Sequence, residues 1–166
     1  MLELAVSGRP ALTVDSRELG RHGPSYTIDT LCSLRQELGP DTSLAWVIGV
    51  DAASTLDGWH AWRRLPELAH LLLLERPGWS LPTGGPVAEM LKACLTDDVA
   101  DLHSAPAGRA WWVGQPPLAV SSSEVRATLL ERRSAAHLLP VPVWAYIKQR
   151  ELYGYHGVPG HEAESE

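Results

Sequence analysis

The sequence contains no phenylalanine and only two cysteines among its 166 residues. Cys32 and Cys94 lie far apart with no metal-type spacing, which argues against a disulfide framework and is typical of reduced thiols in a cytosolic protein. The seven histidines form no HxxxH pair, so no metal site is predicted. His70 precedes an apolar run and is expected to have a structural role.

Positive charge is also scarce. Fourteen lysines and arginines face twenty aspartates and glutamates, giving a formal charge of −6. Nucleic-acid and anionic-membrane surfaces need a basic field, so neither kind of partner is expected. The beginning MLELAVSG has no basic leader and is too short for a membrane span. We expect a cytoplasmic protein in which a few local cations meet any anionic ligand.

Several common catalytic motifs are missing. The sequence has no GxSxG, no P-loop pattern and no GxGxxG, so hydrolase, P-loop ATPase and dehydrogenase functions lose support. No nucleophile with a neighbouring base is evident. Tryptophan is abundant instead, with seven residues. Trp59 and Trp79 follow turn residues and are expected to make contacts outside the core. The other five are expected in the core: Trp46, Trp62, Trp111, Trp112 and Trp144.

Short apolar runs alternate with amphipathic segments along the chain. Residues 44–49, 71–74 and 109–114 have the length and apolarity of buried parallel strands. The alternation predicts an α/β fold, with a Rossmann-like open parallel sheet and helices on both faces. The polar, glycine-rich residues 154–166 predict a disordered tail. Helices are predicted over residues 1–7, 25–38 with Ser25 as N-cap, 87–95, 120–131 and 142–152.

Candidate ligand-binding residues follow the strands, where open parallel sheets bind their ligands. Asp51 either caps the next helix or accepts hydrogen bonds from a ribose or base. Arg76 either clamps a phosphate or is a solvated surface residue. Trp59, after the Asp57-Gly58 turn signal, either stacks on a heteroaromatic ring or closes the core. Together these features favour a nucleotide over a sugar or a peptide.

The stretch VSSSEVRATLLE, residues 120–131, also has two interpretations. Ser121 followed by Glu124 is typical of a capping box. The same helix N-terminus, with Ser123 and Arg126 on one face, is suited to binding an anion, because free amides, hydroxyls and a guanidinium all favour negative charge.

Five motifs together resemble the bacterial nicotinate-nucleotide adenylyltransferase family: GPSYTIDTL, WVIGVDAASTLDGWHAW, LLLLERPGW, VSSSEVRATL and LLPVPVWAYIKQRELY. The resemblance runs from Met1 to about Tyr153, and the order and spacing of the motifs make it specific. It implies a nucleotidyltransferase of NAD biosynthesis. This enzyme transfers AMP from ATP to nicotinate mononucleotide, giving deamido-NAD and pyrophosphate, with Mg²⁺ accompanying ATP.

The resemblance also implies roles for single residues. Tyr26 and Thr27 line the nicotinate-nucleotide side, and Trp59 stacks on the pyridine ring beside His60. Asp51 faces the ribose region, and Arg76 lies near the dinucleotide phosphates. The residues that grip the ATP phosphates are Ser121, Ser123 and Arg126, with capping as a simultaneous role of the serine motif.

One departure from the family pattern concerns catalysis. The family's HxGH motif, whose histidines stabilise the triphosphate, does not occur in this chain. Residues 1–153 are therefore expected to be the C-terminal portion of a single, N-terminally truncated adenylyltransferase domain with impaired activity. Exposed apolar surface then favours association, for example as a homo-oligomer. The alternative is a non-catalytic nucleotide-binding or interaction module derived from the same family.

Overall fold

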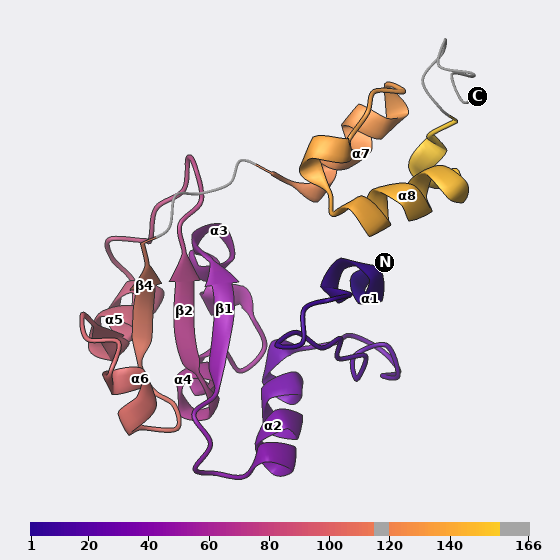
Figure 1. Ribbon diagram of the computed structural model, residues 1–166. Helices are drawn as coiled ribbons and strands as arrows, with labels where there is room; N and C mark the ends of the chain where they lie inside the picture. Colours follow the sequence, from indigo (N-terminus) through magenta and orange to yellow (C-terminus); the bar gives the residue numbers. More distant parts are fainter. Residues whose placement is uncertain (115–119, 157–166) are drawn as a thin grey trace. The chain divides into compact units, whose positions relative to one another are not determined.

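The computed structural model describes residues 1–114 and 120–156, and the chain divides into two compact units (Figure 1). One unit comprises residues 17–119, and the other comprises residues 1–16 together with 120–166. Each unit has its own cluster of buried apolar side chains. None of the helices within the described ranges is long and apolar enough to cross a membrane.

The unit of residues 17–119 is built on a parallel sheet of four strands in the order β1-β2-β4-β3 (Figure 1). The predicted open parallel sheet is thereby confirmed, and the three predicted strands occur within one residue of their expected ends. The fourth strand, β3, was not expected, because its residues continue the apolar pattern of the preceding helix. The strands are β1 Ala45–Gly49, β2 His70–Leu74, β3 Leu95–Thr96 and β4 Ala110–Val113.

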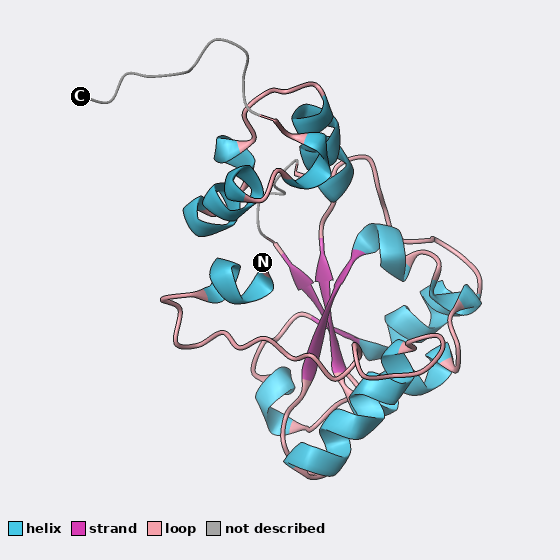
Figure 2. Ribbon diagram, turned by 90° about the vertical axis from the view of Figure 1, so that its right-hand side faces the viewer, coloured by secondary structure: helices cyan, strands magenta, loops and turns pink. Residues whose placement is uncertain are grey.

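Helices and short 3₁₀ turns connect these strands, and most of them lie on one side of the sheet in the view of Figure 2. The predicted helices near residues 25–38 and 87–95 are both present. The α-helices of this unit are α2 Thr27–Leu38, α3 Val50–Ala53, α4 Leu65–Leu68, α5 Pro86–Cys94 and α6 Asp101–Ser104. The 3₁₀ helices are η1 Leu56–Gly58 and η2 Trp62–Arg64.

The core of this unit lies on one face of the sheet. Ile48, Leu73 and Ala110 point to that face and are buried against α2, α4 and α5. Alternate residues of a strand point to opposite faces, and on the other face Val47 is 52% exposed. Trp112 was expected in the core but is 36% exposed. The reason is that β3 ends beside Trp111, so Trp112 has no strand neighbour on that side.

Arg35, on the last turns of α2, ties together the segments that lead into three strands. Its Nε donates to the carbonyl of Leu68 at 2.6 Å, just before β2. Its terminal nitrogens donate to the carbonyls of Thr42, before β1, and Pro106, before β4, each at 2.5 Å. A planar guanidinium can donate in several directions at once. This one side chain therefore fixes the amino ends of β1, β2 and β4 against α2.

His70 completes the same end of the sheet and is fully buried. The backbone N–H of Arg109 donates to its Nδ1 at 3.1 Å, and its Nε2 lies 2.9 Å from the carbonyl of Ala105. Because Nδ1 accepts, the ring proton must be on Nε2, which donates to Ala105. His70 thus joins β2 to the loop before β4, and its expected structural role is confirmed.

The second unit is helical. α1 and α8 contact each other, and α7 contacts η4. Val125, Leu129, Val143 and Ile147 are buried between these elements. Tyr155, expected in the tail, is also buried in this cluster, whereas residues 157–166 of the expected tail lie outside the described residues. The elements are α1 Leu2–Val6, α7 Ser122–Leu130, η3 Ala136–Leu138, α8 Val141–Gln149 and η4 Leu152–Gly154.

The role of Arg35 predicts the effect of its most conservative replacement. We expect Arg35→Lys to lower the free energy of unfolding by about 1.5–3 kcal/mol, because one ammonium cannot reach three diverging carbonyls. Urea unfolding followed by circular dichroism measures this difference. Arg64→Lys is the matched control, since Arg64 makes a 3.7 Å contact with Glu67 and both side chains are more than half exposed; its change should stay within about 0.5 kcal/mol. Equal effects of the two substitutions would contradict the assignment.

Candidate functional site

Four of the predicted site residues line one cavity in the unit of residues 17–119. Tyr26 and Thr27 come from the N-terminus of α2, and Trp59 and His60 come from the turn after η1. The cavity has a volume of about 360 Å³, and Ser25, Gly58 and Leu65 complete its lining. The two motifs that supply these side chains are more than thirty residues apart, so the fold brings them together.

The α2 end of this cavity differs from the sequence expectation. Tyr26, in extended conformation, is the N-cap residue of α2, and it makes no side-chain capping bond to any residue of the described chain. Ser25 was expected to cap the helix. Its hydroxyl instead accepts a hydrogen bond from Nη1 of Arg21 at 3.0 Å. The first turn of α2 consequently has no side-chain cap among the described residues, and a helix N-terminus of this kind favours negative charge.

Aromatic rings form two contacts around the cavity. The rings of Tyr26 and His60 lie 4.6 Å apart with an interplanar angle of 34°. Trp59 lies 5.6 Å from Trp46 of β1, at an angle of 58°. Trp59 is half-buried and packs against the core cluster while it lines the cavity. Trp59 therefore packs against the core and also lines the cavity, and its stacking on a ligand ring stays a prediction.

Asp51 and Arg76 form an ion pair at the carboxyl ends of β1 and β2, with 2.6 Å between Asp51 Oδ2 and Arg76 Nη1. The register explains it: Gly49 pairs with Leu74, and each charged residue follows two positions later. Asp51 does not cap α3, whose N-cap is Gly49. The pair is a quarter to a half exposed, so it stabilises the fold by about 1 kcal/mol or less, but it holds the guanidinium in one place.

Gly49 makes room for this pair. A Cβ on Gly49 would lie closer to Oδ1 of Asp51 than two such atoms can approach. The backbone at Gly49 has φ −68° and ψ 147°, a conformation that any residue adopts. Glycine therefore leaves space here for the carboxylate that folds back over it, and backbone strain plays no part.

The serine motif caps its helix as predicted. Ser121 is the N-cap of α7, and its Oγ accepts a hydrogen bond from the backbone N–H of Glu124 at 3.1 Å. A hydroxyl that accepts one hydrogen bond still has its own proton to donate. Capping and anion binding are therefore chemically compatible at Ser121. Ser123 is exposed, and within the described chain no hydrogen bond or ion pair engages Arg126.

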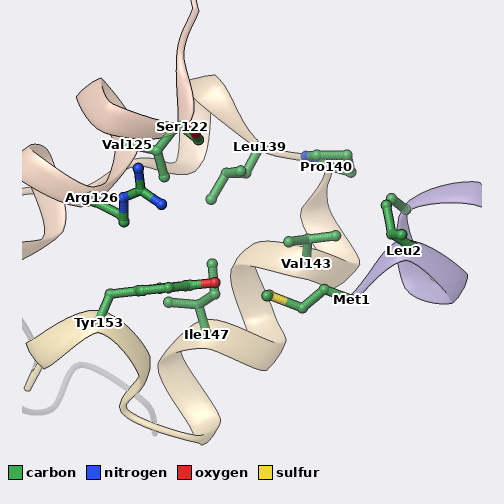
Figure 3. Close-up of a pocket in the computed structure, with 11 residues that line it drawn as sticks. Met1, Leu2, Ser122, Val125, Arg126, Leu139, Pro140, Val143, Ile147 and Tyr153 are labelled. Atoms are coloured by element: carbon green, nitrogen blue, oxygen red, sulfur yellow. The ribbon is translucent and has the colours of Figure 1, made fainter. Parts of the chain in front are cut away.

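Arg126 lies at an apolar pocket between α1, α7 and α8 (Figure 3). Ser122 lies one helical turn before Arg126 and lines the same pocket, whose volume is about 380 Å³. Figure 3 shows the guanidinium of Arg126 above the ring of Tyr153, with Val143 and Ile147 on the α8 side. Sequence reasoning chose Ser121 and Ser123 and missed Ser122, although the i, i+4 spacing to Arg126 was a usable signal.

The described parts of the chain hold no metal cluster, and the Cys94 thiol is not activated. Among these residues no three histidine, cysteine, aspartate or glutamate side chains are grouped to hold a metal ion. Burial raises the pKa of the Cys94 thiol above its ordinary value, and the positive charge of Arg109 opposes part of that shift. Cys94 therefore stays protonated near neutral pH and is no thiolate nucleophile.

Comparison with known proteins agrees with this geometry. The cytidylyltransferase-like family model matches residues 1–128, which defines the class as a nucleotidyltransferase. The chain is 44% identical to a protein of Marinomonas sp. (strain MWYL1) over 92% of this chain and 69% of that protein. It is 43% identical to one of Aeromonas salmonicida (strain A449) over 92% and 71%. Both are named "Probable nicotinate-nucleotide adenylyltransferase". The chain belongs to the nicotinate-nucleotide adenylyltransferase family.

Solved structures agree on the fold. Plasmodium falciparum nicotinic acid mononucleotide adenylyltransferase, complexed with APC, superimposes with a TM-score of 0.55 at 17% identity. The match covers 81% of this chain and 61% of that one. The same protein complexed with NaAD gives a TM-score of 0.55 over 80% and 59%. This chain thus spans about three fifths of the length of those solved chains.

The geometry around Gly49 gives a testable prediction. We expect Gly49→Ala to change the free energy of unfolding by less than about 1 kcal/mol, because only the end of one side chain must move. The displaced carboxylate should nevertheless release Arg76. In side-chain ¹H–¹⁵N spectra, the Arg76 Nε–H resonance of Gly49→Ala should shift in the same direction as that of Asp51→Asn. Gly84→Ala is the control, since a Cβ there meets nothing within 4 Å. An unshifted Arg76 signal in Gly49→Ala would contradict the conclusion that Gly49 makes room for the ion pair.

Proposed function

We propose that this protein transfers AMP from MgATP to nicotinate mononucleotide, giving deamido-NAD and pyrophosphate. In this step a phosphate oxygen of the mononucleotide forms a bond to the α-phosphorus of ATP, and the bond from that phosphorus to the bridging oxygen breaks. The observation that carries the proposal is the cavity where Tyr26 and Thr27 meet Trp59 and His60. Membership in the family supports this reaction, and the cavity is the site that we assign to nicotinate mononucleotide, which accepts the AMP.

The cavity suits a flat, anionic pyridine. Trp59 offers an aromatic face of fixed position, because Trp46 lies behind it, and stacking on such a face is favourable. The uncapped N-terminus of α2 favours a carboxylate at the same place. Within this proposal Tyr26 and Thr27 receive the nicotinate end, and His60 lies beside the ring.

The phosphates call for local cations, since the chain as a whole is acidic. We assign Arg76 to the dinucleotide phosphates, with Asp51 holding its guanidinium and facing the ribose. Ser121, Ser123 and Arg126 are assigned to the ATP phosphates, and Ser122 joins them because it shares a pocket with Arg126. A helix N-terminus, hydroxyls and a guanidinium form a set that suits phosphate.

Alignment and charge are sufficient chemistry for such a transfer. The acceptor phosphate is itself the nucleophile, so the protein need only hold both substrates in line and stabilise the charge on the transferred group. Mg²⁺ enters with ATP, since it binds mainly to phosphates and water and needs few protein ligands. The HxGH histidines of the family are not among these 166 residues.

The alternative of a non-catalytic nucleotide-binding module is not favoured by relatives that are named as adenylyltransferases. A cytoplasmic location, homo-oligomer formation and the absence of a nucleic-acid partner stay predictions from the sequence. The deciding experiment mixes the chain with MgATP and nicotinate mononucleotide. Equal amounts of deamido-NAD and pyrophosphate support transfer, binding of both substrates without product supports the module, and binding of neither overturns the proposal.

The stacking role of Trp59 is tested by truncating its ring. We expect Trp59→Leu to weaken binding of nicotinate mononucleotide by about 1–3 kcal/mol, the range for loss of one stacked ring. Titration calorimetry measures the affinity. Trp79→Leu is the matched control, because Trp79 is 53% exposed and does not line the cavity. If both variants bind the nucleotide like the unmodified chain, Trp59 has no part in recognition.

The anion-binding role of Arg126 gives a separate prediction. We expect Arg126→Ala to weaken ATP binding by roughly 1.5–3 kcal/mol, the range for a hydrogen bond to a charged group. Its thermal stability should change little, because Arg126 is exposed. Arg132→Ala, at an exposed position just after the same helix, serves as control. Lost stability with unchanged ATP affinity would show that the serine motif only caps the helix.

A further inference from the structure

Arg21 binds the chain segment that forms one wall of the cavity. Its Nη1 donates to Ser25 Oγ at 3.0 Å and to Thr30 Oγ1 at 2.9 Å, with a longer contact of 3.5 Å to the carbonyl of Tyr26. The hydroxyl of Thr30 in turn donates to the carboxylate of Glu18. One guanidinium thus connects the loop before α2 with the first turns of that helix.

Two of these acceptors belong to residues that line the cavity. Ser25 and Tyr26 are both part of its wall, and the Tyr26 ring lies against His60 on the opposite side. A displacement of the backbone at Tyr26 would therefore change the width of the cavity and the position of His60. The Glu18–Thr30–Arg21 network reaches the ligand-binding surface through Tyr26.

Little else holds the part of this wall that precedes Tyr26. Residues 22–25 make no backbone–backbone hydrogen bond with any described residue, and Gly23 has φ +96°, a region that glycine adopts at low cost. The wall is exposed rather than packed in the core. The carbonyl of Tyr26 accepts two backbone hydrogen bonds within the first turn of α2, so the Arg21 side chain mainly tethers the Ser25 side of this wall.

We propose that Arg21 is a positioning residue that sets the cavity wall at Ser25 and Tyr26, and thereby the affinity for the pyridine mononucleotide. This inference rests on the proposed function, because it assumes that the mononucleotide occupies this cavity. Arg21 acts through the wall residues and does not contact the ligand itself. One nitrogen of its guanidinium, Nη1, reaches a hydroxyl of the loop and a hydroxyl of the helix at the same time, and the shorter lysine side chain is not expected to place its ammonium there.

Arg17 provides a matched comparison within the same loop. It also donates to α2, to Ser33 Oγ at 3.1 Å and to Glu37 at 2.8 Å. Its partners lie further along the helix, and neither lines the cavity. Replacing Arg17 therefore removes loop-to-helix bonds without touching the wall.

The test compares Arg21→Lys with Arg17→Lys in the full chain, with nicotinate mononucleotide as the probe. Arg21→Lys should raise the dissociation constant of the mononucleotide by about tenfold, the effect of losing one charged hydrogen bond. The dissociation constant of ATP should not change, and Arg17→Lys should leave both constants unchanged. Melting temperatures are recorded for each variant, so that a loss of folded protein is distinguished from a loss of affinity.

Substitutions at Thr30 test whether the hydrogen-bond network, and not only the stability of the fold, sets the affinity for the mononucleotide. Thr30→Ser keeps the hydroxyl and should retain the affinity, whereas Thr30→Val should weaken it about as much as Arg21→Lys. The double variant of Arg21→Lys and Thr30→Val should be no weaker than either single one, because both break one network. If the unmodified chain fails to bind the mononucleotide, the proposed function fails. If it binds and Arg21→Lys binds equally well, this inference alone is overturned.

Discussion

The structure of the larger unit depends on the way one guanidinium fixes the amino ends of three parallel strands. Three backbone carbonyls from different segments accept hydrogen bonds from separate nitrogens of the Arg35 guanidinium, so a change in the position of any one segment would break a bond. His70 adds two hydrogen bonds at the same end. Once the strand starts are fixed, the register of β1 against β2 is fixed as well. The positions of all residues that leave the opposite end of these strands then follow.

That opposite end carries two of the residues proposed to bind the substrates. Asp51 and Arg76 meet because Gly49 and Leu74 are partners in the ladder, and a slip of one residue would separate them and also exchange the two faces of the strand. The polar ends of the sheet therefore have different tasks. At one end the backbone carbonyls are paired with Arg35 and His70, whereas the other end carries the Asp51–Arg76 ion pair, which we propose to lie beside the substrates. Such a division is typical of open parallel sheets.

Local patterns predicted much of this molecule. The strands were predicted because buried parallel strands are continuous apolar runs, and the Ser121 cap was predicted because a cap depends on residues three positions apart. The motif residues Tyr26, Thr27, Trp59 and His60 were chosen from sequence, and the fold places them around one cavity. What local patterns could not supply were interactions set by tertiary structure. Ser25 had the composition of a cap, but Arg21 takes its hydroxyl.

Other features escaped prediction for the same physical reason. The Asp51–Arg76 pair depends on strand register, which no short pattern encodes. Arg35 falls on the apolar stripe of α2 and carries no local sign of its three carbonyl partners. Trp112 has apolar neighbours in sequence, but its burial depends on the length of β3, a strand of two residues. Propensity and periodicity predict the secondary structure of a segment. The hydrogen-bond, ion-pair and ring partners of its side chains depend instead on residues that are distant in sequence.

The contact between Tyr26 and His60 has a consequence for the thermodynamics of recognition. Two side chains that would otherwise rotate freely at the surface already restrain each other at 4.6 Å. If the cavity binds a planar ligand as proposed, less side-chain freedom remains to be removed on binding, so the entropic penalty of ordering the protein is smaller. The binding site is then preorganised, and a larger part of the attraction between its rings and the ligand ring contributes to the net affinity.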